Sequence, residues 1–325
     1  MNLSSKHVLI AGGAGFIGSA LTRYLLNLGS RITVVDDYTR GNRENLHDHL
    51  NSIELIEKDL SVETVSMRCV DIVVDLAAQV FGVRHLHRDG GQMLAKNIRT
   101  TVNLVEEAAH SGVARYVYVS SSCVYDFPGA VIPHREEDTG NPSSQYGQSK
   151  WYGENIVRAF AEQSGMKFAM TRLFNVYGPN ESPNSPHVIV DFMRKAHEIR
   201  AGRADSFEII GDGTQTRSFC HVDDIVRGLV LLAADPRAEG QVFNLGAPDA
   251  MTIQSLAEKI VAMYEIANVK YEHVTAPSRD ITQRAPDISK AVELLGWEPE
   301  IGFDQGLQQI RVWIEPLVDR LEWRL

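Results

Sequence analysis

The chain has only three cysteines in 325 residues, too few for the disulfide framework of a small secreted domain. Cys69, Cys123 and Cys220 are far apart, so they also lack the paired spacing of a zinc site. No metal is therefore expected, and the composition favours a reducing compartment. We expect Cys69 and Cys220 to be structural, whereas Cys123 lies among residues suited to chemistry.

Long hydrophobic runs are also missing. None approaches the length of a bilayer span, and the N-terminus leads directly into a strand without the pattern of a secretory signal. Basic residues are outnumbered, since 32 Lys and Arg face 42 Asp and Glu and give a formal net charge of -10. We expect a cytoplasmic protein that binds neither membrane nor nucleic acid, and an anionic substrate would need local arginines.

What the chain does contain is a glycine-rich turn after its first apolar run. Gly12, Gly15 and Gly18 follow the run 7–11, and apolar residues from Phe16 onward recur at helical spacing. Strand, loop and helix in this order are typical of a dinucleotide-binding site. Glycine permits the tight turn and the approach of a pyrophosphate, and the helix N-terminus supplies N–H donors. The alternative is a structural glycine turn that binds nothing.

The second expected strand delivers a carboxylate to the position of a ribose. It spans 31–35 and is followed by Asp36, 24 residues after Gly12. A carboxylate there accepts hydrogen bonds from ribose hydroxyls and repels the additional phosphate of NADP, so we expect NAD as the cofactor. Arg40 and Arg43 are nearby in the sequence and weaken this preference.

Short apolar runs alternate with segments of helical spacing along the first half of the chain. This alternation predicts a doubly wound α/β fold, in which a parallel sheet of the Rossmann type is covered by helices on both faces. Asp59 and Leu60 follow the third run, where ligands of such sheets collect, although Asp59 could equally cap a helix. The expected strands are 53–56, 72–78, 116–119 and 168–174, and the expected helices are 92–109 and 146–161.

The composition of the sequence changes after Phe174, because residues 175–186 are rich in residues that form turns. We therefore assign 1–175 to an NAD-binding domain and 176–325 mainly to a smaller substrate-binding lobe, with 206–245 returning to the first domain. The elements expected in the second part are a strand at 207–210 and helices at 188–200, 223–233, 253–264, 288–295 and 303–318.

Two segments have side chains suited to acid–base chemistry. Tyr146 and Lys150 open a predicted helix, and their spacing puts the phenol and the ammonium on one face, where the cation can lower the phenol pKa. A tyrosinate there could remove a proton from a sugar hydroxyl. The strand before them ends at Ser121, Ser122 and Cys123, and hydroxyls at that edge could align the same substrate group or simply cap the sheet.

Six ordered motifs make this chain similar to the extended short-chain dehydrogenase/reductases that act on nucleotide sugars. The resemblance runs almost from end to end, and it implies an NAD-dependent homodimer with a nucleoside-diphosphate sugar bound between two lobes. The motifs are the glycine loop, Ser-Ser-Ser-x-Val-Tyr at 120–125, Tyr-x-x-x-Lys at 146–150, Arg-Leu-Phe-Asn-Val-Tyr-Gly-Pro at 172–179, the segment 211–219, and the segments 287–291 and 295–297.

The resemblance also implies roles for the residues that match the family motifs. Ser121, Tyr146 and Lys150 would form the active site, and arginines would hold the diphosphate because guanidinium groups suit phosphate oxygens. The implied substrate contacts are Ser122, Asn175, Arg217 and Arg279, with Arg284 as the alternative to Arg279. The implied cofactor contacts are Gly12, Gly15, Phe16, Ile17, Gly18, Asp36, Asp59, Leu60, Ala77, Tyr146 and Lys150.

Members of this family first oxidise the sugar to a keto intermediate and then differ in the steps that follow. We expect an epimerase, in which Tyr146 removes the hydroxyl proton, hydride moves to NAD, and hydride then returns to the other face of a 4-keto sugar. A 4,6-dehydratase is disfavoured, because those enzymes carry Asp-Glu where this chain has Ser122 and Cys123. A net oxidoreductase and a non-catalytic dinucleotide sensor are further alternatives.

Cys123 leaves open which carbon is inverted. In the similar GDP-mannose 3,5-epimerases the strand end reads Ser-Ser-Ala-Cys-Ile-Tyr, and its cysteine exchanges a ring proton, as a thiol with a pKa near neutrality can. Those enzymes add a lysine in the loop after Tyr-Gly-Pro, but residues 180–186 contain none. His187, His85 and His87 are candidate replacements. Alternatively, Cys123 is an inert buried residue.

Overall fold

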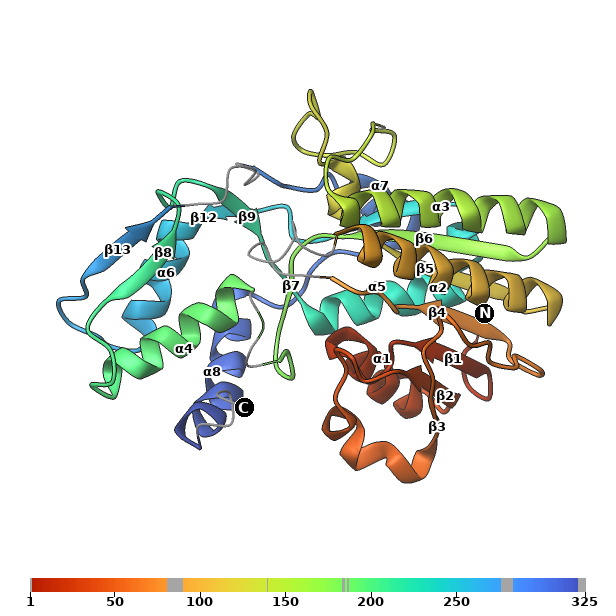
Figure 1. The fold of residues 1–325 in the computed structure, drawn as a ribbon, viewed down its shortest axis with the longest axis horizontal. Helices are drawn as coiled ribbons and strands as arrows, with labels where there is room; N and C mark the ends of the chain where they lie inside the picture. Colours follow the sequence, from red (N-terminus) through yellow and green to blue (C-terminus); the bar gives the residue numbers. More distant parts are fainter. Residues whose placement is uncertain are drawn as a thin grey trace.

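The computed structural model describes residues 2–80, 90–138, 140–182, 185, 187–275 and 283–320. These form a larger and a smaller lobe (Figure 1). The larger lobe is built on a seven-stranded sheet in the order β11-β6-β5-β4-β1-β2-β3, whose paired strands all run parallel. Its strands are β1 (His7–Ala11), β2 (Arg31–Asp36), β3 (Ile53–Glu57), β4 (Ile72–Asp75), β5 (Arg115–Ser121), β6 (Lys167–Leu173) and β11 (Val242–Leu245).

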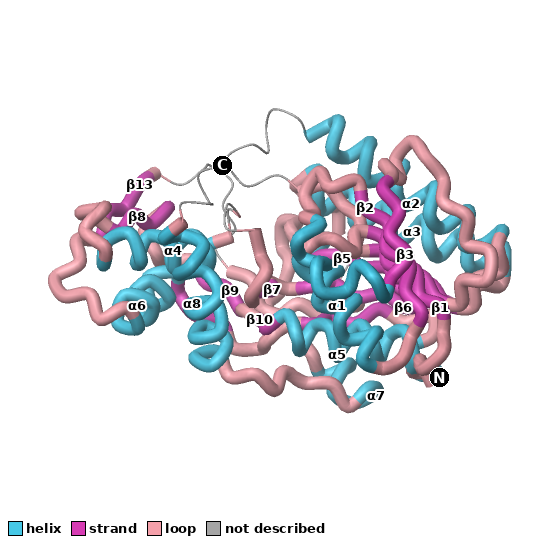
Figure 2. Tube along the Cα trace, turned by 90° about the horizontal axis from the view of Figure 1, so that it is seen from below, coloured by secondary structure: helices cyan, strands magenta, loops and turns pink. Residues whose placement is uncertain are grey.

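Helices cover both faces of this sheet, which confirms the predicted doubly wound α/β fold. In β1, Val8 and Ile10 belong to the core under one face, whereas Leu9 and Ala11 belong to the core under the other. Successive strand side chains point to opposite faces, so a strand covered on both sides must be apolar throughout. Figure 2 shows α1 and α5 on one side of the sheet and α2 and α3 on the other. These helices are α1 (Phe16–Asn27), α2 (Gly90–His110), α3 (Gln145–Ser164) and α5 (Val222–Ala234).

The smaller lobe has a separate apolar core, in which three helices pack around a short strand pair. Phe207 and Ile209 of β8 and Leu307 and Ile310 of α8 are fully buried there. β8 pairs with β13 in parallel and β9 pairs with β12 antiparallel. The elements are α4 (Val188–Arg200), β8 (Phe207–Ile210), β9 (Thr216–Ser218), β12 (Ala250–Thr252), α6 (Ile253–Met263), β13 (Tyr271–Val274) and α8 (Phe303–Asp319).

The chain passes between the lobes more than once. Within 206–245, β8 belongs to the smaller lobe, whereas α5 packs against α1 and β11 extends the large sheet beside β6. Helix α7 (Ser289–Leu295) also joins the core of the larger lobe, where Ala291 and Trp297 are buried. The remaining elements are β7 (Val176–Tyr177), which pairs with β10 (Cys220–His221), and the 3-10 helices η1 (Arg43–Ser52), η2 (Ser122–Tyr125) and η3 (Pro236–Ala238).

A buried ion pair joins α3 to β6. Glu154 accepts hydrogen bonds from Arg172 Nε at 2.9 Å and Nη2 at 2.8 Å, and from Ser120 Oγ at 2.7 Å. Arg172 Nη1 donates to the Tyr125 hydroxyl at 2.9 Å, which in turn donates to Asn244 Oδ1 at 2.7 Å. The network therefore fixes α3 against β5, β6 and β11. None of the described helices combines the length and the apolar character needed to cross a bilayer.

Candidate active site

The glycine loop after β1 accepts only glycine at two of its positions. Gly12 has a φ of +76°, and a Cβ on it would lie 3.0 Å from the backbone nitrogen of Ala77. A Cβ on Gly18 would lie 2.3 Å from the carbonyl oxygen of Gly12. The loop is therefore packed against its own helix and against the exit of β4, as a pyrophosphate-binding turn requires.

Helix α1 begins directly behind this loop and offers an anion site. Its N-cap is Gly15, which provides no side-chain cap, and the first turn, from Phe16 and Ile17 onward, contains no acidic residue. The N–H groups of a first helical turn have no intrahelical partner and carry the positive end of the helix dipole. The loop and the helix therefore fit the pyrophosphate of NAD.

Asp36 ends β2 beside the glycine loop, and it is largely buried. Its carboxylate accepts the N–H of Ala14 and the N–H of Tyr38, both at 2.9 Å. Burial raises the pKa of Asp36, and the two N–H donors offset only part of this rise. Each carboxylate oxygen can accept a second hydrogen bond, so the group retains capacity for ribose hydroxyls. Arg40 donates to the carbonyl oxygen of Val80 at 2.6 Å.

Asp59 and Leu60 lie in a turn after β3. Asp59 Oδ1 accepts hydrogen bonds from the N–H and the hydroxyl of Ser61 at 2.9 and 2.7 Å, and Oδ2 lies 3.0 Å from the Lys96 ammonium. The alternative in which Asp59 caps a helix is wrong, because turns and loop follow it. The Leu60 carbonyl accepts a hydrogen bond from Asn103 Nδ2 at 2.9 Å. Asp59 and Leu60 lie at the edge of the sheet where the cofactor is expected, and their contact with it stays a prediction.

Two of the predicted catalytic hydroxyls meet at the end of β5. Ser121 is the last residue of that strand, and Tyr146 is the second residue of α3. The N-cap of α3 is Ser144, whose hydroxyl accepts the N–H of Gly147 at 3.0 Å and so fixes where the helix begins. A hydrogen bond joins the hydroxyls of Ser121 and Tyr146. A sugar hydroxyl could therefore meet both groups at one point.

The pKa of Tyr146 is shifted opposite to the expected direction. Burial raises it, ionisation of Cys123 would raise it further, and the hydrogen bond with Ser121 offsets only part of the rise. Lys150 donates its ammonium to the carbonyl oxygen of Val119 at 2.8 Å. Burial also lowers the pKa of Lys150. The ammonium is thus engaged at the end of β5, and the phenol stays protonated at neutral pH in the chain alone.

Cys123 belongs to a charged cluster that the sequence did not reveal. Arg284 Nη1 donates to Cys123 Sγ at 3.7 Å, and Arg284 Nη2 donates to both carboxylate oxygens of Asp126 at 2.6 and 2.8 Å. The thiol is hydrogen bonded to Asp126 as well. Burial raises the pKa of Cys123, and the guanidinium offsets only part of this rise. The cluster therefore holds a protonated thiol beside Tyr146, the arrangement of a proton donor rather than of a thiolate.

Three of the other predicted substrate contacts, Arg217, Ser122 and Asn175, lie among the residues that the structure describes. Burial raises the pKa of Asp126, and the charge of Arg217 on β9 counters it, so this arginine faces the same cluster. Ser122 is buried in η2, and Asn175 is partly buried just before β7. The predictions for Arg279, His85 and His87 fall outside the described residues.

His187 precedes α4 and is paired with a buried carboxylate. Its Nδ1 forms an ion pair with Glu181 Oε1, which also accepts the hydroxyl of Ser185 at 2.6 Å. Partial desolvation lowers the pKa of His187, but the charge of Glu181 outweighs this effect and the pKa is raised. The charge of Arg40 acts on both His187 and Tyr146. An imidazole oriented by a carboxylate suits acid–base work, and this role stays a prediction.

The fold and the site together define an extended short-chain dehydrogenase/reductase that uses NAD. The chain belongs to the NAD dependent epimerase/dehydratase family, whose model matches residues 8–246. Gly12, Gly18 and Asp36 have the shape and chemistry to hold the cofactor, for the reasons of packing and acceptor capacity given above. When bound, NAD supplies a group that accepts hydride from a sugar and can return it.

Known proteins of this kind differ in the reaction for which they are named. The chain is 34% identical to UDP-glucuronic acid decarboxylase 4 of Arabidopsis thaliana over 312 residues, which are 92% of this chain and 66% of that protein. It therefore spans slightly less than two thirds of that relative. The UDP-glucose 4-epimerase of Thermotoga maritima, solved with UDP-glucose, has a TM-score of 0.86 and 28% identity over 96% of this chain and 99% of its own. MoeE5, solved with UDP-glucuronic acid and NAD, has a TM-score of 0.83 and 30% identity over 95% and 99%.

Proposed function

We propose that the protein is an NAD-dependent epimerase of a nucleoside-diphosphate sugar. The contact between Ser121 and Tyr146, at the same sheet edge as the glycine loop, supports this function most directly. Tyr146 takes the proton from the 4-hydroxyl of the sugar, and Ser121 aligns that hydroxyl. After the keto sugar has turned over, the same phenol returns the proton. Arg217 holds the diphosphate, so the sugar can rotate while its nucleotide stays bound.

A second reaction is decarboxylation of a nucleotide-linked uronic acid, which the similarity to UDP-glucuronic acid decarboxylases favours. Oxidation at C4 of such a sugar gives a β-keto acid. Its C5–C6 bond breaks, CO2 leaves with no acid–base group required, and the electron pair remains in an enolate that takes a proton at C5. Cys123, whose pKa is raised by burial, would donate that proton.

A substrate panel in D2O separates these reactions. The purified protein, with no added cofactor, is incubated with UDP-glucose, UDP-N-acetylglucosamine, UDP-glucuronic acid or GDP-mannose, and the products are examined by NMR. We expect a 4-epimer without deuterium on carbon and without lasting absorbance at 340 nm. Release of CO2 indicates a decarboxylase, and accumulating NADH indicates a net oxidoreductase. A protein that neither contains nor takes up NAD rules out the proposal.

Replacing Cys123 with serine tests whether the thiol takes part. In a 4-epimerase we expect kcat within about threefold of the parent, because general acid–base work is done by Tyr146 alone. In a 3- or 5-epimerase, the variant should no longer place deuterium on carbon, and its kcat should fall by about 100-fold or more. Cys69→Ser is the matched control, since Cys69 is exposed and has no part in the site. Deuterium exchange that vanishes only in the Cys123 variant would contradict the plain 4-epimerase.

We also propose that the protein is a cytoplasmic homodimer whose subunits meet through α2 and α3. These helices pack side by side on one face of the sheet, and Tyr152 of α3 is 43% exposed. A mass near twice 36.1 kDa in light scattering is the expected result. A mass of one chain would contradict the dimer.

A further inference from the structure

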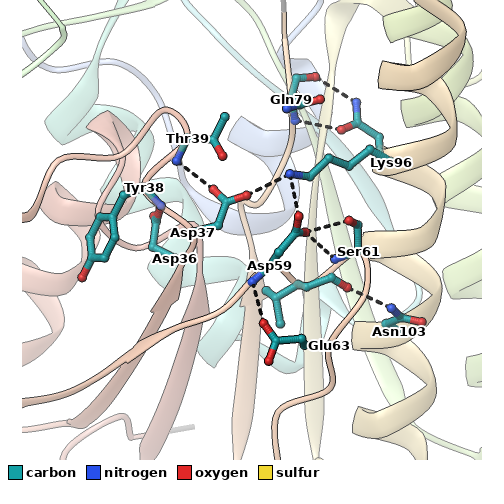
Figure 3. Close-up of polar contacts among 12 residues, drawn as sticks. Asp36, Asp37, Tyr38, Thr39, Asp59, Ser61, Glu63, Gln79, Lys96 and Asn103 are labelled. Atoms are coloured by element: carbon teal, nitrogen blue, oxygen red, sulfur yellow. Dashed lines mark hydrogen bonds and ion pairs between the residues drawn. The ribbon is translucent and has the colours of Figure 1, made fainter.

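One lysine bridges the exits of two neighbouring strands at the edge where the cofactor is expected. Lys96 of α2 places its ammonium 2.9 Å from Asp37 Oδ2 and 3.0 Å from Asp59 Oδ2 (Figure 3). Asp37 directly follows β2, and Asp59 lies in the turn after β3. The three side chains are only 24 to 36% exposed, so the bridge is shielded from solvent more than a typical surface ion pair.

The second oxygen of each carboxylate is held by its own turn. Asp37 Oδ1 accepts the N–H of Thr39 at 2.9 Å, and Asp59 Oδ1 accepts the N–H and hydroxyl of Ser61. Each carboxylate is thus fixed at both ends, by backbone on one side and by Lys96 on the other. The ammonium therefore sets the separation of the two turns.

Helix α2 holds the same sheet edge at two further points. Asn103, two helical turns beyond Lys96, donates Nδ2 to the Leu60 carbonyl at 2.9 Å. Asn97 accepts the N–H of Gln79 at 2.7 Å and donates to its carbonyl at 2.9 Å, which fixes the loop after β4. The exits of β2, β3 and β4 are therefore all tied to one helix, and Lys96 takes part in the ties to both β2 and β3.

The local charge explains why a cation is needed there. Asp36 and Asp37 are adjacent, and the charge of Asp37 adds to the burial that raises the pKa of Asp36. Burial opposes ionisation of Asp59 as well, but hydrogen bonds from Ser61 and Lys96 outweigh it and lower its pKa. Without the ammonium, the carboxylates of Asp37 and Asp59 would lose the cation between them, beside the turns expected to receive a dinucleotide that carries negative charge itself.

We propose that Lys96 is a positioning residue for the adenosine half of NAD. It holds the exits of β2 and β3 at a fixed separation, so that Asp36, Asp59 and Leu60 face the nucleotide in a preformed arrangement. The residue acts through these neighbours and does not touch the reacting atoms. The effect belongs to cofactor binding and is independent of which sugar reaction the protein catalyses.

Replacing Lys96 with methionine tests this role by binding rather than by turnover. Two quantities are measured on the purified protein: NAD bound per subunit, and the rate at which bound NAD exchanges with radiolabelled NAD. We expect bound NAD to exchange about tenfold faster. ADP-ribose, which lacks the nicotinamide, should also displace bound NAD about tenfold faster. At saturating NAD, kcat should stay within about twofold. Lys96→Arg, which keeps the cation, should recover most of the affinity.

Two further variants separate positioning from charge and from stability. Lys259→Met removes a surface ion pair with Asp304 in the smaller lobe and should leave NAD exchange unchanged. Asp37→Ala breaks the bridge but makes the net charge less negative. Faster exchange of bound NAD in this variant supports positioning. Slower exchange indicates that Lys96 acts through its charge alone and overturns the proposal. Wild-type exchange in Lys96→Met also overturns it, whatever happens to the thermal midpoint, because a purely structural ion pair would affect only the melting temperature.

Discussion

Replacing Tyr146 with phenylalanine should lower kcat by about 100- to 10,000-fold while NAD stays bound. The substitution removes the hydroxyl that is hydrogen bonded to Ser121 and keeps the ring in its half-buried position. The hydroxyl proton of the sugar then lacks the base that the proposed mechanism assigns to it. Initial rates with the substrate found in the panel, together with the NAD content of each preparation, measure the effect.

Tyr152→Phe is the matched control, because it removes a tyrosine hydroxyl six residues further along α3, from a residue that is 43% exposed. It should keep parental activity. A Tyr146→Phe variant with more than about a tenth of the parental kcat would contradict the role of this phenol.

The pH dependence of kcat/KM gives a second test of the role of Tyr146. Burial raises the pKa of Tyr146, and ionisation of Cys123 would raise it further, so the deprotonated base becomes more populated as the pH rises toward that pKa. Therefore kcat/KM should climb through the alkaline range in the parent protein. In Tyr146→Phe this climb should be absent. A flat alkaline profile in the parent would indicate that another group accepts the proton.

Local patterns in the sequence predict the fold and part of the site. The apolar runs that become β1, β4 and the 116–119 part of β5 are continuous because both sheet faces are covered, and the helix predicted at 188–200 spans those residues in the structure. The meeting of Ser121 and Tyr146 follows from a strand end and a helix start that the motifs mark. In contrast, β7, β9, β10 and β12 have two or three residues each, too few for a periodic signal.

Side-chain pairs made by long-range folding could not be predicted in the same way. Arg284 and Asp126 are 158 residues apart, and Lys96 and Asp37 are 59 apart, so no local spacing joins them. The pKa of Tyr146 depends on burial, which the four-residue spacing to Lys150 does not report. The sequence indicates which reactive side chains reach an edge of the sheet, and the charges that surround them emerge only from the packed chain.

The buried pair of Glu154 and Arg172 should dominate the stability of the larger lobe. Replacing Glu154 with alanine leaves an unpaired guanidinium in the core and should lower the free energy of unfolding by about 3–5 kcal/mol, measured by urea denaturation. Arg158→Ala is the control, because Arg158 lies 3.6 Å from the same carboxylate but is 41% exposed, and it should cost less than about 1 kcal/mol.

The pair also makes a specific prediction for acid conditions. Burial opposes ionisation of Glu154, but the hydrogen bonds and charge of Arg172 outweigh it and lower its pKa in the folded chain. A carboxylate with a lowered pKa stabilises the fold above its ordinary pKa and loses that contribution as the pH falls through the lowered value. The difference between parent and Glu154→Ala should therefore shrink in acid. Replacing both partners with methionine should restore much of the stability at neutral pH, because an apolar pair leaves no buried charge unmatched. If the double variant is as unstable as Glu154→Ala, the loss reflects packing rather than the unpaired guanidinium.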